Sequence, residues 1–423
     1  MKRIFCLLLC FLLLCGCTGP DSADSPASQS IQRTEPSDPE QRLTYRRELA
    51  ESCMRKMMSI RWKVPNAISY SATHNSKGME LDNKSNIVSI LPNQIYQGMP
   101  YSHGGSSIYS FLSIAGEPDE NGVYTLEGLT KELLSGYSGR DPHNTARLGN
   151  DCADAVFWSW AQVSSSITFP YTNCMVPAYG CIRVGDYDCG SGAYAGNTSE
   201  ICSQNGIQRM YEAYACIEKA DALVRTVNSA GHAIMAVSVH VVRLEDGTID
   251  GDNSYVIYLD QDIACETGSV RYEDPAMGTV MLCEELDKQH TFAYLFQVGF
   301  LPVTCKELTD PAPLKEPTVT DEFSNYSLDN IFTGTITGSY RISYVQVEIA
   351  DSVGNKVQDA ICFGLQEDMY RFNLSRFTNE AEQRVIIGGI DIAKLPSGNY
   401  HCKFNCRLST GDMITFRELE FAK

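Results

Sequence analysis

Apolar and polar residues follow three successive patterns along the chain. Residues 44–60 place apolar side chains at helical spacing opposite charged ones, which predicts an amphipathic helix. After a second helix expected at 208–219, apolar runs bounded by turn residues predict three strands of an antiparallel sheet, at 222–226, 232–243 and 254–260. A fourth strand, 292–300, is expected to close that sheet.

The third pattern is a strict alternation that begins after a proline-rich break. The break, residues 309–320, predicts a linker. Beyond it Val345, Val347 and Ile349 share one face of a strand, and the turn sequences DSVGN, LPSGN and LSTGD separate such runs. Residues 321–423 are therefore expected to form a β-sandwich, similar to the immunoglobulin-like modules of bacterial surface proteins.

The first residues have the layout of a secretory signal. Lys2 and Arg3 precede an apolar run that is too short to span a bilayer. The ending Leu-Cys-Gly-Cys resembles a bacterial lipobox, which implies cleavage before Cys17 and a lipid on its sulfur. Residues 18–43 are expected to be a flexible tether. The protein is thus expected to lie outside the cytoplasm, anchored to the membrane through Cys17.

Charge and cysteine content narrow the function further. The 34 basic and 52 acidic residues give a net charge of −18, which disfavours nucleic acid as a partner. Of 17 cysteines, those of the signal and Cys17 are removed from consideration. If Cys152 stays free, an even number remains, which fits disulfides in an exported protein. The Cys-rich insertion 165–207 has spacings too long for a zinc ribbon, so no metal and no cofactor are expected.

The stretch GNDCADAVFWSW (149–160) carries the candidate chemistry. Cys152 lies at a predicted helix start that Asn150 or Asp151 would cap, and a helix amino terminus favours the thiolate. His232 opens a predicted strand and is the candidate base. His240 would lie about 26 Å further along a straight strand, so it cannot serve the same site.

Four segments together resemble NlpC-type and CHAP-type cysteine peptidases of bacterial cell walls. They are YQGMPYSHGG (96–105), GNDCADAVFW (149–158), DALV (221–224) and GHAIMAVSV (231–239). The resemblance implies an α+β papain-like domain over 44–308, in which a helix bearing the Cys packs on an antiparallel sheet. It further implies Cys152 as nucleophile, His232 as base, Asp260 or, second, Gln261 as the residue that orients the imidazole, and a substrate-lining segment. That segment holds Tyr101, Gly104 and Gly105.

The chain departs from this family after the cysteine, where Ala153 and Asp154 replace the usual Ser and Gly. A negative charge at Asp154 would oppose thiolate formation. The expected function is a membrane-anchored hydrolase of amide bonds in peptidoglycan stem peptides. The alternatives are an N-acetylmuramoyl-L-alanine amidase with the same site, an inactive surface lipoprotein that binds cell wall or a partner protein, and acyl transfer to an amine, as in transglutaminase-like folds.

Overall fold

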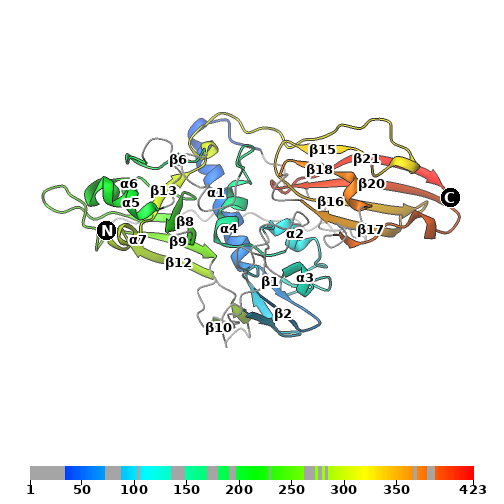
Figure 1. Ribbon diagram of the computed structural model, residues 1–423, viewed down its shortest axis with the longest axis horizontal. Coiled ribbons are helices and arrows are strands. Elements are labelled where there is room, and N and C mark those ends of the chain that lie inside the picture. Colours follow the sequence, from blue (N-terminus) through cyan, green and yellow to red (C-terminus); the bar gives the residue numbers. More distant parts are fainter. Residues whose placement is uncertain are drawn as a thin grey trace, which may run out of the picture.

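The computed structural model describes residues 34–71, 87–101, 105–134, 148–168, 180–189, 197–227, 230–261, 272–274, 279–281, 284–364, 369–378 and 386–423. Helices α1 (Pro39–Ser59) and α4 (Cys152–Trp160) lie side by side at the centre of the molecule (Figure 1). A six-stranded sheet lies at one end, and the C-terminal strands form the other. The two central helices are therefore where the parts of the chain meet.

The six-stranded sheet carries the segments of chemical interest. Its order is β12 (Glu284–Thr291), β9 (Tyr255–Gln261), β8 (Ala230–His240), β7 (Ala222–Val227), β13 (Leu301–Thr304) and β6 (Ile182–Arg183). Helices α1 and α4 lie on its central side in Figure 1. The outer helices are α5 (Thr198–Asn205), α6 (Ile207–Ala215) and α7 (Phe292–Val298). The three strands predicted between 222 and 260 all belong to this sheet.

The strand expected at 292–300 is wrong. That apolar run forms α7, while β12 precedes it and β13 follows it. The side chain of Thr291 accepts a hydrogen bond from Tyr294 N and so caps the start of the helix. Gly299 has a φ of 83° and ends the helix in a left-handed turn. A polar cap and a glycine thus turn an apolar run into a helix.

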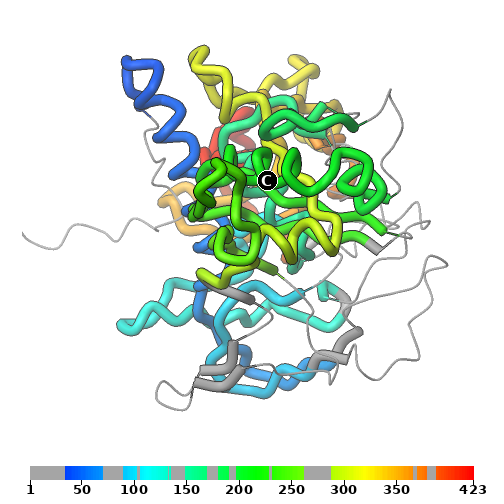
Figure 2. The backbone as a smooth tube through the Cα atoms, turned by 90° about the vertical axis from the view of Figure 1, so that its left-hand side faces the viewer, coloured from blue at the N-terminus to red at the C-terminus, as the bar shows by residue number. Residues whose placement is uncertain are grey.

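A second sheet forms from segments for which no strand was predicted. Its order is β10 (Tyr272–Asp274), β11 (Thr279–Met281), β4 (Ile95–Gln97), β1 (Arg61–Lys63) and β5 (Val123–Thr125). A separate hairpin pairs β2 (Ile68–Ser71) with β3 (Ile87–Ile90). The helices here are short: α2 (Ile108–Leu112) and α3 (Lys131–Leu134). Figure 2 shows the blue and cyan segments of this part below the green segments of the six-stranded sheet.

The C-terminal region, residues 321–423 with β14, contains two further sheets. One has the order β14 (Val319–Asp321), β15 (Thr335–Gly338) and β18 (Arg371–Asn373). The other has the order β19 (Ile386–Gly388), β17 (Lys356–Phe363), β16 (Ile342–Asp351), β20 (Asn399–Leu408) and β21 (Met413–Ala422). Short 3₁₀ turns lie between the strands of this region, at Leu328–Asn330, Leu374–Phe377 and Ile392–Lys394. The alternating residues Val345, Val347 and Ile349 of β16 are fully buried in the core of this region.

The expected fold class, a papain-like α+β domain followed by a β-sandwich, is wrong. The protein is mostly β with few helices, about 25% helical. Its described strands form four sheets of three or more strands. This arrangement is similar to that of a four-bladed β-propeller. The physical reason is that three-residue strands from distant segments pair with each other. Such strands are too short to give a periodic signal in the sequence.

The predicted linker is held firmly by α1. Arg46 is fully buried, and its guanidinium donates to the carbonyl oxygens of Glu307, Asp310 and Ala312 at 2.5–3.0 Å. It also pairs with Glu35 at 2.6 Å. Helix α1 begins at Pro39, inside the predicted tether, because the side chain of Asp38 caps its first turn. The chain around 307–312 is therefore fixed to the helix that packs on α4.

The cysteines do not form the full set of disulfides that their even number suggested. Free thiols are present at Cys189, Cys202, Cys216, Cys305, Cys402 and Cys406. Cys402 and Cys406 lie in the C-terminal core, where they pack as small apolar side chains. Within the described insertion, order comes from packing instead. Tyr187, for example, is buried and its hydroxyl donates to Pro302 O at 2.9 Å. Cys174, Cys265 and Cys283 lie outside the described residues.

Membrane attachment through the lipobox concerns residues outside the described part of the chain. Among the described helices, none combines the length and the apolar character that crossing a bilayer requires.

Replacing Arg46 by Met is expected to lower the free energy of unfolding by about 3 kcal/mol, since it leaves Glu35 and three carbonyl groups without their buried donor. Chemical denaturation monitored by tryptophan fluorescence measures the change. Arg209→Met is the control: its ion pair with Asp186 is exposed, so a loss below about 1 kcal/mol is expected. Equal losses of unfolding free energy in the two variants would contradict a special stabilising role for the buried contacts of Arg46.

Candidate active site

The turn before α4 sets Cys152 at the first position of the helix. Gly149 has a φ of 95°, which favours glycine, and Asn150 forms a parallel bridge with Tyr101. Asp151 is the cap: its side chain accepts from Asp154 N at 2.9 Å. Cys152 itself is 5% exposed. Its sulfur thus begins at the positive end of the helix dipole, in a nearly dry environment.

Every residue of α4 is buried, and two tryptophans fix its orientation. Trp158 Nε1 donates to Gly105 O and Trp160 Nε1 donates to Ala220 O, both at 2.8 Å. Gly105 belongs to the predicted substrate-lining segment, and its φ of 64° favours glycine. These bonds hold the helix between that segment and the turn before β7.

His232 and Asp260 come from neighbouring strands of the six-stranded sheet. The register pairs Met235 of β8 with Leu259 of β9, which places Asp260 diagonally opposite His232. His232 Nε2 lies 3.0 Å from Asp260 Oδ2. His232 also lies close enough to Cys152 for the charge of each to shift the pKa of the other. Because Nε2 faces the carboxylate, Nδ1 is the ring nitrogen that serves the sulfur.

The charge state of His232 is set by its two neighbours. Burial alone lowers the pKa of the imidazole, but the negative charges of Asp260 and of an ionised Cys152 outweigh it, and the pKa lies well above its ordinary value. The protonated ring is therefore favoured next to Asp260. An imidazolium held in this position can donate a proton to a leaving group.

Burial shifts the pKa of Cys152 in the opposite direction. It raises the pKa of the thiol above its ordinary value, while the charge of the nearby His232 acts to lower it. Asp151 and Asp260 add small contributions that raise it. The thiolate thus depends on His232 for its stability, because no other neighbour favours the ionised form as strongly.

Asp154, the departure from the family pattern, is buried beside the C-terminal region. Burial and the charge of Asp151 raise the pKa of its carboxyl well above the ordinary value, and Arg341 acts in the opposite direction. Arg341 lies over the rings of Trp158 and Phe157, with its guanidinium carbon 4.0 and 4.3 Å from their centroids. A raised pKa reduces the negative charge that Asp154 brings to the start of α4. Its opposition to the thiolate is correspondingly smaller.

The structure brings Cys152, His232 and Asp260 together and places the other predicted residues around them. Gln261 is buried with its amide donating to Met99 O at 2.9 Å, so it fixes β9 to another segment and makes no hydrogen bond to the imidazole. Tyr101 is buried, 7% exposed, at the bridge to Asn150. Gly104 and Cys17 lie outside the described residues. His240 stacks on Tyr255, with ring centroids 4.9 Å apart, at the far end of β8.

Contacts from the C-terminal region were not foreseen from the sequence. Ser409 donates through its hydroxyl to Ala161 O at 2.6 Å, and Gln162 donates to Ser409 O at 2.5 Å. Together with Arg341, they contact the carboxyl-terminal half of α4 and the turn that follows it. No local pattern in the sequence indicates such contacts, because the partners are separated by more than 180 residues.

No family model, curated protein or solved structure matches this chain. The arrangement of the three side chains therefore stands on its own geometry. Across the described parts of the chain, no cluster of three His, Cys, Asp or Glu side chains is suited to hold a metal ion.

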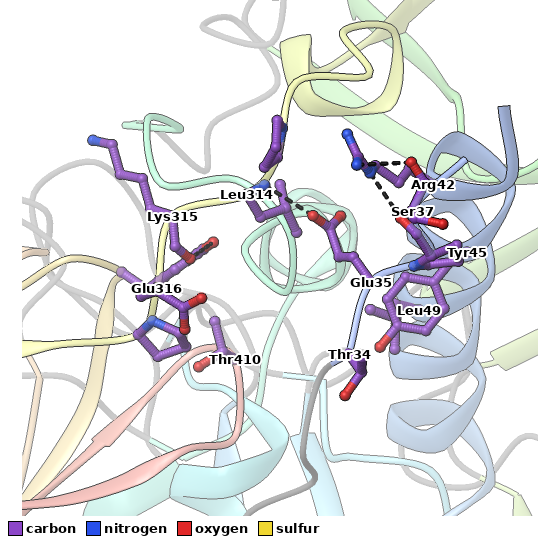
Figure 3. Close-up of a pocket in the computed structure, with 14 residues that line it drawn as sticks. Thr34, Glu35, Ser37, Arg42, Tyr45, Leu49, Leu314, Lys315, Glu316 and Thr410 are labelled. Atoms are coloured by element: carbon purple, nitrogen blue, oxygen red, sulfur yellow. Dashed lines mark hydrogen bonds between the residues drawn. The ribbon is translucent and has the colours of Figure 1, made fainter. Parts of the chain in front are cut away.

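Two cavities lie away from these side chains. One, of about 400 Å³, lies where the start of α1 meets residues 313–317. Figure 3 shows Glu35 and Leu49 there, facing Leu314 and Glu316. The other, of about 490 Å³, lies between the segment around Gly116 and strands β17 and β19. Neither is lined by Cys152, His232 or Asp260, so hydrogen bonding, and not cavity size, identifies the candidate site.

Asp260→Asn is expected to lower the pKa of His232, because it removes the negative charge that favours the imidazolium. In the wild type the raised pKa contributes stability that is fully present below the ordinary value of 6.5 and is lost as the pH rises through the higher folded value. Titration of the His232 ring protons by NMR measures the shift. A titration unchanged by the substitution would refute the pairing.

His232→Ala is expected to slow the alkylation of Cys152 at neutral pH, because it removes the group that lowers the pKa of the buried thiol. Iodoacetamide labelling followed by peptide mass spectrometry measures the rate for each cysteine. Cys216 is exposed and serves as an internal control for the reagent. Faster labelling of both thiols would instead indicate loss of structure.

Proposed function

We propose that the protein is a cysteine hydrolase that cleaves amide bonds in peptidoglycan stem peptides through a thioester intermediate. The observation that supports this most directly is the proximity of Cys152, His232 and Asp260, with His232 hydrogen-bonded to Asp260 and the sulfur at a helix start. The resemblance of four segments to NlpC-type and CHAP-type peptidases favours the cell wall as the source of substrate. The lipobox at Cys17 supports an anchored protein outside the cytoplasm.

The chemistry begins with the proton of the thiol. The neutral form of His232 takes it through Nδ1, which gives the imidazolium that Asp260 favours, and the sulfur attacks the amide carbonyl carbon to form the C–S bond. The carbonyl oxygen becomes an oxyanion, which the backbone N–H of Cys152 at the start of α4 is placed to stabilise. When the C–N bond breaks, His232 returns its proton to the leaving nitrogen. The acyl group remains on sulfur as a thioester.

Water completes the cycle. His232 removes a proton from the water while its oxygen attacks the thioester, and the C–S bond breaks to release a carboxylic acid and the thiol. Asp260 holds the ring in the required tautomer and favours the imidazolium that forms in both halves of the reaction. No cofactor is needed to balance these steps.

Cys152→Ser is expected to reduce hydrolysis of purified muropeptides by a factor of about 10³ or more. The hydroxyl is a weaker nucleophile than the thiol, and its pKa is too high for His232 to ionise it as readily. Mass spectrometry of the products measures turnover and identifies the bond. Cys216→Ser, which changes an exposed thiol, is the matched control and should retain activity.

The products separate the alternatives. Cleavage between the lactyl group and L-alanine would identify the protein as an amidase. A product joined to an added amine would identify the reaction as acyl transfer. No turnover by the wild type, with retained binding of muropeptides, would replace the hydrolase proposal by an inactive surface lipoprotein.

A further inference from the structure

Arg225 lies next to the candidate catalytic histidine on the sheet. Strands β7 and β8 pair antiparallel, and the register places Arg225 directly opposite His232. Side chains of directly opposed residues leave an antiparallel sheet on the same face, with their Cβ atoms about 5 Å apart. Since His232 reaches Cys152 from that face, Arg225 begins on the side of the sheet that carries the site.

Arg225 has no hydrogen-bond or ion-pair partner among the described residues. Its Nε is buried without an acceptor, and the side chain as a whole is half-buried. Two arginines of α1 are paired with carboxylates: Arg46 pairs with Glu35 and Arg47 pairs with Asp221. The buried Nε of Arg225 has no such acceptor among the described residues. A buried donor in this state gains from an external acceptor.

We infer that Arg225 binds a carboxylate of the substrate, close to the scissile amide. The inference rests on the proposed function, because it assigns specificity to the same site. The guanidinium presents two parallel N–H groups that match the two oxygens of a carboxylate. Since Arg225 and His232 are cross-strand neighbours, the carboxylate belongs within about one residue of the bond that His232 helps to cleave.

The charge of the whole protein makes such a contact necessary. At a net charge of −18 the surface repels anionic peptides, so an acidic substrate requires a local cation at the site. Asp260 already engages His232 and adds negative charge next to the reacting groups. Arg225 lies on β7, the neighbour of the strand that carries His232, and the substrate class it selects is a peptide with a free carboxylate.

The test compares one stem tetrapeptide with free carboxylates and the same peptide with amidated carboxyl groups. The wild type should have a kcat/KM about 10 to 100 times higher for the acid form, as expected when a charged partner is lost. In Arg225→Gln this ratio should fall to about 1. Arg225→Lys should keep part of it, since it retains the charge without the planar fork. Arg209→Gln, an exposed arginine, should keep the full ratio.

Binding separates this inference from the proposed function. Calorimetry with Cys152→Ala measures the dissociation constants of both peptides without turnover. A preference for the acid form that Arg225→Gln removes would support the inference even if the wild type cleaved neither peptide. Equal binding of both peptides by Cys152→Ala, or an unchanged preference in Arg225→Gln, would overturn it whether or not hydrolysis occurs.

Discussion

Burial of α4 on all sides is the constraint on which the rest of the structure depends. A helix of nine residues is marginal by itself in water, so its stability comes from what encloses it. The six-stranded sheet, α1, the segment at Gly105 and the C-terminal region each contribute one wall. Trp158 connects two of them, because its ring lies beneath Arg341 and its Nε1 donates to Gly105. The position of Cys152 is thus determined by the whole chain.

The same burial governs the candidate chemistry. A dry environment penalises the thiolate, and the helix dipole and His232 oppose that penalty from two directions. Asp260 in turn favours the positive charge on His232. The site therefore contains one net negative charge when sulfur and imidazole are both ionised, in a chain that is already acidic. Arg225 on the adjacent strand is placed where a compensating positive charge is required.

Features that depend on neighbouring residues could be predicted from the sequence, and features that depend on distant pairing could not. The cap at Asp151 and the strand that begins near His232 follow from local signals. The choice between Asp260 and Gln261 needed the register of β9 against β8, which a bulge between Ala236 and Ser238 alters. The second sheet was missed because β1, β4 and β5 have three residues each, too few to show a period.

The residues around 307–312 show why the division into separate domains understates the structure. A proline-rich break usually separates domains that move independently. Here Arg46 fixes the break to α1, α1 packs on α4, and Ser409 of the C-terminal region bonds to the end of α4. These contacts connect α1, the linker, the C-terminal region and α4 to one another. The C-terminal sheets therefore lie at a fixed distance from Cys152, and any ligand bound to them is presented to the site at a defined position.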